Sequence, residues 1–323
     1  MKFLVLFIIL LLVELIYFKI ADKLNIIDKP NLRSSHTHIT LRGGGIIFLI
    51  GAWLWALIWG PSIYPWFLVG MTIISVISFI DDVHSVPNRY RIIVHFIAMM
   101  IMFLQWDIIN GSDWPWVIVA LIICTGIINA YNFMDGINGI TAAYSIAVIL
   151  PTLVLNHYHH FIENSFLIAT LISLGIFAVF NFRKRARCFA GDVGSVGMAF
   201  IVIFALGMLV ISQKDLSFII FLALYGVDTI LTIIHRLMLH ENIFEAHRKH
   251  AFQLMSNELH IPQLIVSSFY GIVQLLISFG LIYLPVSRGI YAITVVIVLC
   301  ICYILFMRKY YHLHEEYLQS KVK

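Results

Sequence analysis

Two neighbouring carboxylates, Asp81 and Asp82, are the first residues in this sequence whose types and spacing could do chemistry. They lie in the stretch FIDDVHS (79–85), at the end of a long apolar segment. Adjacent carboxylates repel each other, so one of the two could serve as a general base, or both could hold a divalent cation. The same pair could also be an inert, solvated acidic cap on a loop. This motif alone leaves both interpretations open.

A third carboxylate, Asp192, lies between glycines in FAGDVGS (189–195), immediately before another apolar segment. Glycine allows the backbone to approach a ligand closely, and a helix that begins near Ser195 would favour an anion such as phosphate at its N-terminus. Mg²⁺ prefers one or two carboxylates together with substrate phosphates, which makes Asp192 a candidate metal ligand. Taken alone, however, the motif is better explained as an ordinary helix cap.

The stretch NAYNFMDGINGI (129–140) places polar side chains between two runs that are apolar enough to lie in lipid. It contains no basic residue that could balance its aspartate. Polar groups without partners are strongly unfavourable in lipid. We therefore expect Asn132, Asp135 and Asn138 to line a cleft at a membrane boundary.

A stretch rich in histidine and arginine, HRLMLHENIFEAHRKHAFQLM (235–255), is the main basic candidate. The spacing predicts that His247, Arg248 and His250 share a face of a short helix or turn, where they would form a cationic patch suited to phosphate oxygens. No cysteine lies nearby and the spacing is not that of a zinc site, so no structural metal is expected. A solvated basic loop is the alternative.

Two further features carry less information. Asp228 and Arg236 are eight residues apart, hence on one helix face, and are expected to form a structural ion pair. The stretch RSSHTHITLRGGG (33–45) could form a turn that cradles phosphate, or a flexible hinge. Its candidate residues, ahead of three glycines, are Arg33, His36, His38 and Arg42.

The composition identifies the class of protein in which these motifs lie. Of 323 residues, 61% are hydrophobic and 12% are charged, and the mean hydropathy is +0.94. Soluble domains carry about a quarter charged residues, so we predict a polytopic membrane protein. The run 2–20 carries Glu14 and lacks a small-residue cleavage site, which favours a retained span over a signal peptide. The cysteines are expected to be free thiols: Cys124, Cys188, Cys300 and Cys302.

The apolar runs predict an all-α bundle of about eleven transmembrane helices, in a single membrane domain that covers residues 1–323. In lipid the backbone must satisfy its own hydrogen bonds, which favours helices, and the period-2 alternation of a β-barrel is absent. The predicted segments are 2–20, 43–60, 63–80, 92–107, 115–130, 138–156, 163–182, 195–213, 216–235, 262–285 and 289–307.

Lysine and arginine predict the orientation, because they are enriched in cytoplasmic loops. Successive loops between the predicted segments lie on opposite sides of the membrane, and the loops on one side, with the C-terminal tail, hold 18 of the 21 basic residues. This set is predicted to be cytoplasmic, with the N-terminus outside and the C-terminus inside. Since topology explains the basic residues, we expect no nucleic-acid partner. The cytoplasmic loops are 19–42, 81–91, 131–137, 183–194 and 236–261, followed by the tail 308–323.

All the candidate motifs fall on this predicted cytoplasmic side. Carboxylates, glycine turns and a His/Arg patch that converge there would form one cleft for a metal ion and a phosphorylated ligand. The competing class is a transporter or channel whose acids couple to ions. Such proteins usually carry acids near the middle of the membrane and often have repeated halves, whereas here the acids lie at one edge and no repeat is visible.

The set and order of these motifs resemble the polyprenyl-phosphate N-acetylhexosamine-1-phosphate transferases, the MraY- and WecA-like glycosyltransferase family 4. The resemblance extends over residues 33–255. The family pattern DD matches Asp81-Asp82, GDxGS matches Gly191 to Ser195, and the histidine-bearing loop matches Arg248 and His250. The pattern NxxNxxDGxDG matches Asn129, Asn132, Asp135 and Gly136.

Two departures from the family pattern change what is expected. The second acid of DGxDG is Asn138 here, which implies an altered contact to the nucleotide or sugar, because asparagine can hydrogen-bond but cannot act as a base. The stretch EAHRKHAFQ lacks the repeated histidines of the muramoyl-pentapeptide branch, and His247 stands where the WecA branch often has aspartate. The chain is most similar to the O-antigen-initiating, WecA- and WbpL-like branch.

The resemblance implies an MraY-like bundle in the bacterial inner membrane, with a cytoplasmic active site and a homodimer as a compatible assembly. It implies transfer of HexNAc-1-phosphate from a UDP-HexNAc to undecaprenyl phosphate in the membrane lipid, with release of UMP. The donor sugar could be GlcNAc, FucNAc or QuiNAc, and the reaction would initiate O-antigen or a related polysaccharide.

The resemblance also implies roles for individual residues. Asp192 would bind Mg²⁺, or Mn²⁺ in its place, and Asp81 and Asp82 would orient or deprotonate the lipid phosphate or help to hold the metal. The nucleotide-sugar cleft would be lined by Asn132, Asp135 and Asn138. The phosphate oxygens would be steadied by His247, Arg248 and His250.

Overall fold

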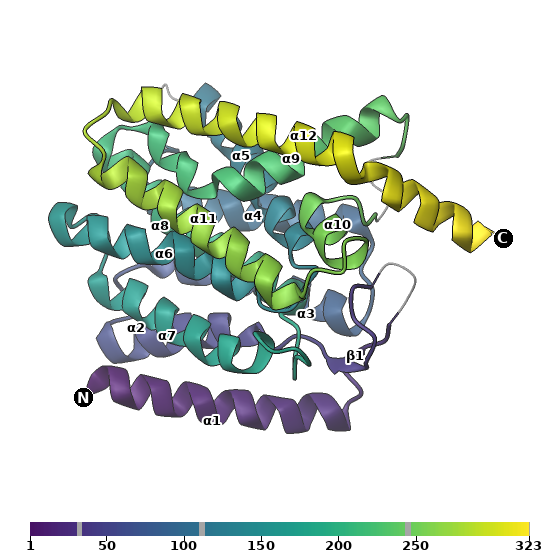
Figure 1. Ribbon diagram of the computed structural model, residues 1–323. Coiled ribbons are helices and arrows are strands. Elements are labelled where there is room, and N and C mark those ends of the chain that lie inside the picture. Colours follow the sequence, from purple (N-terminus) through teal and green to yellow (C-terminus); the bar gives the residue numbers. More distant parts are fainter. Residues whose placement is uncertain (31–33, 110–113, 243–246, 323) are drawn as a thin grey trace.

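The computed structural model of the protein describes residues 1–30, 34–109, 114–242 and 247–322. Within these ranges the chain is almost entirely helical, and its long helices lie side by side in one bundle (Figure 1). The helices are α1 (Lys2–Lys23), α2 (Ile46–Trp59), α3 (Pro65–Val83), α4 (Asn88–Gln105), α5 (Trp114–Met134), α6 (Ile140–His159), α7 (Asn164–Asn181), α8 (Gly191–Gln213), the 3-10 helix η1 (Leu216–Leu222), α9 (Ala223–Met238), α10 (Ala251–Asn257), α11 (Gln263–Tyr283) and α12 (Arg288–Val322).

The predicted all-α polytopic fold is confirmed. Each of the eleven predicted segments corresponds to a helix of the bundle, with η1 and α9 together forming one of them. Nine of the described helical segments are long and apolar enough to cross a membrane. The other two are α2, which has 14 residues, and α4, which begins with a polar turn.

Several boundaries differ from the prediction. Helix α5 continues to Met134, so Asn132 lies on a helix and not in the predicted loop 131–137. Helix α8 begins at Gly191, four residues before the expected start at Ser195. Helix α12 has 35 residues and runs on through the predicted tail 308–323 as far as Val322, because its polar end packs against the segment around α10.

The predicted loops 19–42 and 236–261 contain short elements of their own. Strands β1 (Ile27–Asp28) and β2 (Thr40–Leu41) pair antiparallel, and Leu41 forms a parallel bridge with Cys188. Helix α10 follows the predicted histidine patch. The strand β1, the helix α10 and the C-terminus all lie at one end of the bundle, opposite the N-terminus (Figure 1). We call this the site end.

The core of the bundle is built around α8. Its most apolar window is 78% buried, whereas that of α12, at the edge, is only 11% buried. Helix α3 packs closely on α8, where Phe67 stacks on Phe204 with ring centroids 4.4 Å apart. Because α3 ends at the DD pair and α8 starts at Asp192, this packing brings the three carboxylates to the same place.

Candidate active site

Two arginines join the three carboxylates of the DD and GDVGS motifs. Arg42 Nε lies 2.7 Å from Asp82 Oδ1, and its Nη2 lies 3.4 Å from Asp192 Oδ1. Arg91 Nη1 lies 2.7 Å from Asp81 Oδ2, and its Nη2 lies 2.6 Å from Asp192 Oδ2. The guanidinium groups offset the repulsion between acids that lie so close together. The structure therefore brings Asp81, Asp82 and Asp192 into one cluster, as the sequence predicted.

Asp82 acts as a cap for α8, supplied by another helix. Its Oδ1 accepts the backbone N–H of Asp192 at 2.8 Å, and its Oδ2 accepts that of Val193 at 3.0 Å. This capping explains why α8 starts early, since the first N–H groups of a helix need acceptors. Gly191 makes the approach possible, because it has φ +70° and a Cβ there would lie 2.4 Å from Asp82 Oδ2.

Asp81 has a different environment, although it is the next residue in the chain. Its Oδ1 accepts the N–H of Val86 at 2.6 Å, and its Oδ2 pairs with Arg91. Its side chain is 9% exposed, while that of Asp82 is fully buried. Asp81 thus shares the Arg91 guanidinium with Asp192.

The three glycines that follow Arg42 hold its backbone in position beside the acids. The sequence alone predicted Arg42 only as part of a turn or hinge. The N–H groups of Gly44 and Gly45 donate to the carbonyls of Phe189 and Ala190, at 2.9 and 3.0 Å. Tyr17 Oη donates to the carbonyl of Arg42 at 2.6 Å. A Cβ at Gly45 would lie 2.1 Å from Gly194 Cα, so the two glycine-rich motifs pack backbone to backbone.

The other candidate residues of the stretch 33–45 differ in whether they reach the cavity. His36 lies at the cavity wall beside Phe189, with ring centroids 4.7 Å apart, and burial lowers its pKa. His38 is exposed and does not line the cavity. Arg33 lies outside the described residues. Arg91 was not predicted as a site residue; its position ten residues after Asp81, at the start of α4, is the only signal in the sequence.

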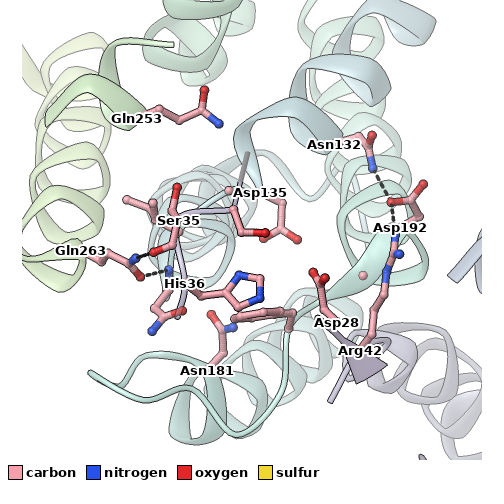
Figure 2. A pocket seen from close by; sticks show the side chains of 16 residues that line it. Asp28, Ser35, His36, Arg42, Asn132, Asp135, Asn181, Asp192, Gln253 and Gln263 are labelled. Atoms are coloured by element: carbon pink, nitrogen blue, oxygen red, sulfur yellow. Dashed lines mark hydrogen bonds and ion pairs between the residues drawn. The ribbon is translucent and has the colours of Figure 1, made fainter. Parts of the chain in front are cut away.

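A cavity of about 210 Å³ opens beside the acidic cluster (Figure 2). Figure 2 shows Asn132 pointing at Asp192, and its Nδ2 donates to Asp192 Oδ1 and to Ser195 Oγ, at 3.1 Å each. Asn132 and Asp192 lie side by side, whereas Asn181, Gln253 and Gln263 lie across the cavity, where they form an amide wall (Figure 2). The carboxylates that line the cavity are Asp28, Asp135 and Asp192, and the amides are Asn132, Asn138, Asn181, Gln253 and Gln263.

Asp135 lies in the cavity wall just after α5. Thr141 Oγ1 donates a hydrogen bond to its carboxylate. Withdrawal from water is the main cause that raises the pKa of Asp135 to about 7; the bond from Thr141 opposes this rise, and the charge of Asp192 adds to it. Asp135 therefore titrates near neutral pH while facing the cavity.

Asn138 ties three segments together through its backbone and side chain. Its Nδ2 donates to the carbonyls of Arg183 and Lys184, at 2.8 and 3.3 Å. Its N–H donates to Gln263 Oε1 at 3.0 Å, and Gln263 Nε2 also bonds the carbonyl of Ser35. An aspartate could not donate to those two carbonyls. The departure from the family pattern thus has a structural consequence here.

His247, Arg248 and His250 do not line the cavity among the described residues, in contrast to what their predicted role requires. Arg248 Nη2 lies 2.8 Å from Glu258 Oε1, and its guanidinium lies over the ring of Tyr317. Burial is the main cause that lowers the pKa of His247 to about 3, so this histidine is neutral and adds no charge to a cationic patch.

The expected ion pair between Asp228 and Arg236 is not formed. His250 Nδ1 lies 3.2 Å from Asp228 Oδ1, which also accepts the N–H of Ala251 at 3.1 Å. Arg236 pairs with Glu241 at 3.1 Å. Helical spacing correctly places Asp228 and Arg236 on one face, but different neighbours pack there.

The donor set next to the cavity is compatible with a divalent cation that is shared with a ligand. Within the described ranges, no three His, Cys, Asp or Glu side chains gather to hold a metal ion by themselves. Mg²⁺ commonly takes one or two carboxylates and completes its shell with phosphates and water. The paired carboxyl groups of Asp81 and Asp192 supply that number.

These features define a polytopic helical membrane protein with a polar cavity between clustered acids, two arginines and an amide wall. Residues 64–213 match the family model described as glycosyl transferase family 4. This segment contains the DD pair, the NAYNFMDG stretch and the GDVGS motif. Over this segment, which is a little under half of the chain, the protein is similar to glycosyl transferase family 4.

Named relatives agree with this family. The chain is 27% identical to a Bacillus subtilis protein named "Probable undecaprenyl-phosphate N-acetylglucosaminyl 1-phosphate transferase", over 72% of this chain and 70% of that protein. It is 26% identical to the undecaprenyl-phosphate alpha-N-acetylglucosaminyl 1-phosphate transferase of Yersinia pestis, over 58% of this chain and 56% of the relative. It is 32% identical to the phospho-N-acetylmuramoyl-pentapeptide-transferase of Thermotoga neapolitana, over 44% of this chain and 46% of the relative.

Proposed function

We propose that this protein transfers HexNAc-1-phosphate from a UDP-HexNAc to a polyprenyl phosphate such as undecaprenyl phosphate. An oxygen of the lipid phosphate attacks the β-phosphorus of the donor. The bond from that phosphorus to the bridging oxygen breaks, and UMP leaves with the electron pair. The names of the relatives support a polyprenyl-phosphate acceptor and a phospho-sugar product.

The observation that carries this proposal is the cluster of Asp81, Asp82 and Asp192, joined by Arg42 and Arg91 at the edge of the cavity. Both reactants are anions, and their approach requires cationic groups held in advance. Arg42, which lines the cavity, is placed to meet phosphate oxygens. Arg91 neutralises the two acids until a ligand arrives.

The three carboxylates then have separate roles. Asp192, with Asp81 beside it, would hold Mg²⁺, which when bound supplies charge neutralisation to the diphosphate and the departing UMP. Asp82 has both oxygens engaged by Arg42 and by the start of α8, so we assign it the positioning of Asp192. Asp81 is the better candidate to orient or deprotonate the lipid phosphate.

The amide wall is the part of the cavity suited to the nucleotide and sugar, because amides pair with neutral polar groups in either direction. Asn132 and Asp135 also line the cavity, and we propose that they take part in the same contacts. His247, Arg248 and His250 would act indirectly, by fixing the segment that contains Gln253. We propose GlcNAc, FucNAc or QuiNAc as the donor sugar.

The membrane and the orientation of the chain in it are part of the same proposal. We propose that the chain lies in a bacterial inner membrane with the site end in the cytoplasm and the N-terminus outside. Its product would start O-antigen or a related envelope polysaccharide, and a homodimer is compatible with this function. The enrichment of lysine and arginine in the loops at the site end supports this orientation.

The test is an assay of detergent-purified protein with polyprenyl phosphate, Mg²⁺ and a panel of UDP-HexNAc donors, in which UMP and lipid-linked sugar are both measured. Asp192→Asn should keep the fold and lower UMP release about 10²- to 10³-fold, as expected for loss of a preorganised charge. Asp215→Asn, at the other end of α8, is the matched control and should remain active.

Two results would contradict the proposal. Near-normal release by Asp192→Asn would remove Asp192 from the metal role. A folded protein that releases no UMP with any donor would argue against the transferase, and ion flux in proteoliposomes of that protein would favour the transporter class.

A further inference from the structure

A second concave region lies at the site end, outside the candidate active site. It is a cavity of about 490 Å³ between the last turns of α1, the hairpin β1–β2 and the segment that precedes α8. Its charged lining residues are Lys19, Asp22 and Arg187. The apolar lining comes chiefly from Phe18, Ile39 and Leu41. None of these residues takes part in the proposed reaction.

Neither cation of this cavity has an acidic partner in the part of the chain that the structure describes. Among the described residues, no salt bridge engages Lys19, Asp22 or Arg187. Arg187 lies over the ring of Phe18, with its Cζ 5.1 Å from the centroid. The lining therefore keeps a net positive charge, with two cations against one acid, beside an aromatic face. Such a lining is suited to a phosphate group.

The surroundings of the cavity are apolar on the side of α1. Ile16 lies one turn before Lys19, on the same helix face, and is 55% exposed. Ile20 is 48% exposed and Leu24 is 64% exposed. Ile39, in the cavity lining, belongs to a loop and is nevertheless 62% exposed. A ligand with a phosphate and long apolar chains would cover these residues, which a free phosphate would not do.

We propose that this cavity binds the headgroup of an anionic phospholipid. The headgroup phosphate would lie between Lys19 and Arg187, and the acyl chains would follow the exposed face of α1 past Ile16. Lysine and arginine at the membrane surface attract anionic lipids by about 1 kcal/mol each, which is a factor of about five. Asp22 opposes only part of this attraction.

The site is directly connected to the catalytic cluster. Leu41 precedes Arg42, and Arg187 precedes Cys188, which forms the bridge with Leu41. A lipid held against Leu41 and Arg187 therefore contacts the two segments that lead to Arg42 and Asp192. This connection gives the bound lipid a position from which it stabilises the active-site loops.

The experiment uses the full chain in nanodiscs of phosphatidylcholine that contain a minor fraction of phosphatidylglycerol, and native mass spectrometry to count the phosphatidylglycerol retained. The test variant is the double substitution Lys19→Gln and Arg187→Gln. The control is Lys184→Gln with Arg185→Gln, which removes the same charge next to the cavity but outside its lining. Two parallel arms replace phosphatidylglycerol with phosphatidylethanolamine or add inorganic phosphate.

Wild type and control should retain phosphatidylglycerol preferentially, and the test variant should lose this preference by a factor of about five for each cation removed. Equal retention by all three proteins, or an equal loss in test variant and control, would overturn the site. Equal retention of phosphatidylethanolamine, or full displacement by inorganic phosphate, would overturn the assignment to an anionic lipid. If the double variant does not fold, the exposed single substitution Lys19→Gln gives the same comparison against Lys184→Gln.

Discussion

Asp82 caps the helix that carries Asp192: its two carboxylate oxygens accept the first N–H groups of α8, at 2.8 and 3.0 Å. The cap comes from α3, a helix more than a hundred residues earlier in the chain. It fixes the position of Asp192 relative to α3. Arg42 and Arg91 each form ion pairs with one carboxylate of α3 and with Asp192 of α8. The acidic motifs are therefore one structural unit, in which a change at one residue displaces the others.

Gly191→Ala tests this unit at its closest contact. The residue has φ +70°, and an added Cβ would lie 2.4 Å from Asp82 Oδ2. Non-glycine residues in the left-handed region cost about 1–3 kcal/mol, and the clash would also push Asp82 from the start of α8. We expect lower thermal stability and a loss of UMP release of about 10²-fold or more, since small displacements of a reacting group have effects of that size.

Gly175→Ala is the matched control for this prediction. A Cβ at Gly175 meets no atom within 4 Å, and the residue lies inside α7. Alanine is favoured over glycine in a helix interior by about 1 kcal/mol, so stability should stay level or rise and activity should be unchanged. Equal activity in Gly175→Ala and Gly191→Ala would contradict the tight contact between Asp82 and α8.

Arg42→Lys tests the bridge between Asp82 and Asp192. A guanidinium offers several donors in one plane, whereas the ammonium of lysine is a single point charge. Lysine cannot keep both carboxylates in place, so kcat/KM should fall about 10- to 100-fold while the fold is retained. Steady-state assays of Arg42→Lys and of Arg89→Lys make the comparison, because Arg89 is exposed and forms no salt bridge with a described residue, although it hydrogen-bonds Tyr90. A wild-type kcat/KM for Arg42→Lys would show that the bridge is dispensable.

The pKa of Asp135, raised to about 7 from an ordinary 3.8, makes stability depend on pH. The folded state retains a proton that the unfolded state has lost, so the contribution of this group to stability is full below pH 4 and falls as pH rises toward 7. Melting temperatures in a chelating buffer should therefore decline more steeply between pH 4 and 7 for wild type than for Asp135→Asn. Parallel curves for the two proteins would mean that Asp135 is ionised throughout this range.

Much of the architecture could be predicted from the sequence, because the length of an apolar run is a local property. Each apolar run corresponds to a helix, and the acids of three separate motifs meet at one end of the bundle, as the prediction required. The boundaries were less accurate where a contact from elsewhere in the chain determined them. Helix α8 starts early because Asp82, from α3, caps it, and α12 continues because it packs beside α10.

The identity of the partners could not be predicted in the same way. Helical periodicity places Asp228 and Arg236 on one face, but it does not reveal that His250 and Glu241 lie opposite them. Arg42 and Arg91 lie in two separate stretches that were predicted to be cytoplasmic loops, and only the folded chain joins them to Asp192. Whether such residues belong to the site depends on long-range packing.

Asn138→Asp would restore the acid of the family pattern, yet we expect it to impair this protein. The Nδ2 group of Asn138 donates to the carbonyls of Arg183 and Lys184, and a carboxylate there would face two acceptors. Loss of such buried hydrogen bonds costs about 1–3 kcal/mol, so thermal stability and the affinity for the UDP-sugar should both fall. Asn88→Asp, at an exposed position, is the control. A more active Asn138→Asp would instead favour a catalytic or nucleotide-binding role for an acid at this position.

Asp228→Asn tests how the segment around α10 is held. Asp228 lies in α9 and accepts hydrogen bonds from the N–H of Ala251 at 3.1 Å and from Tyr270 Oη at 2.7 Å, next to the contact with His250. An amide in its place turns one acceptor into a donor that faces other donors. The loss should be about 2–4 kcal/mol, typical of a buried charged acceptor.

The measurement for Asp228 is backbone hydrogen exchange over residues 250–257, compared between wild type, Asp228→Asn and Tyr270→Phe. The aspartate variant should lose most of its protection there, and the tyrosine variant, which removes one hydrogen bond, should lose less. Because this segment contains Gln253, which lines the cavity, KM for the UDP-sugar should rise in the same order. Unchanged exchange in Asp228→Asn would mean that α10 is held by its contacts with α12 instead. The next residue to change would then be Arg248, which contacts both Glu258 and Tyr317.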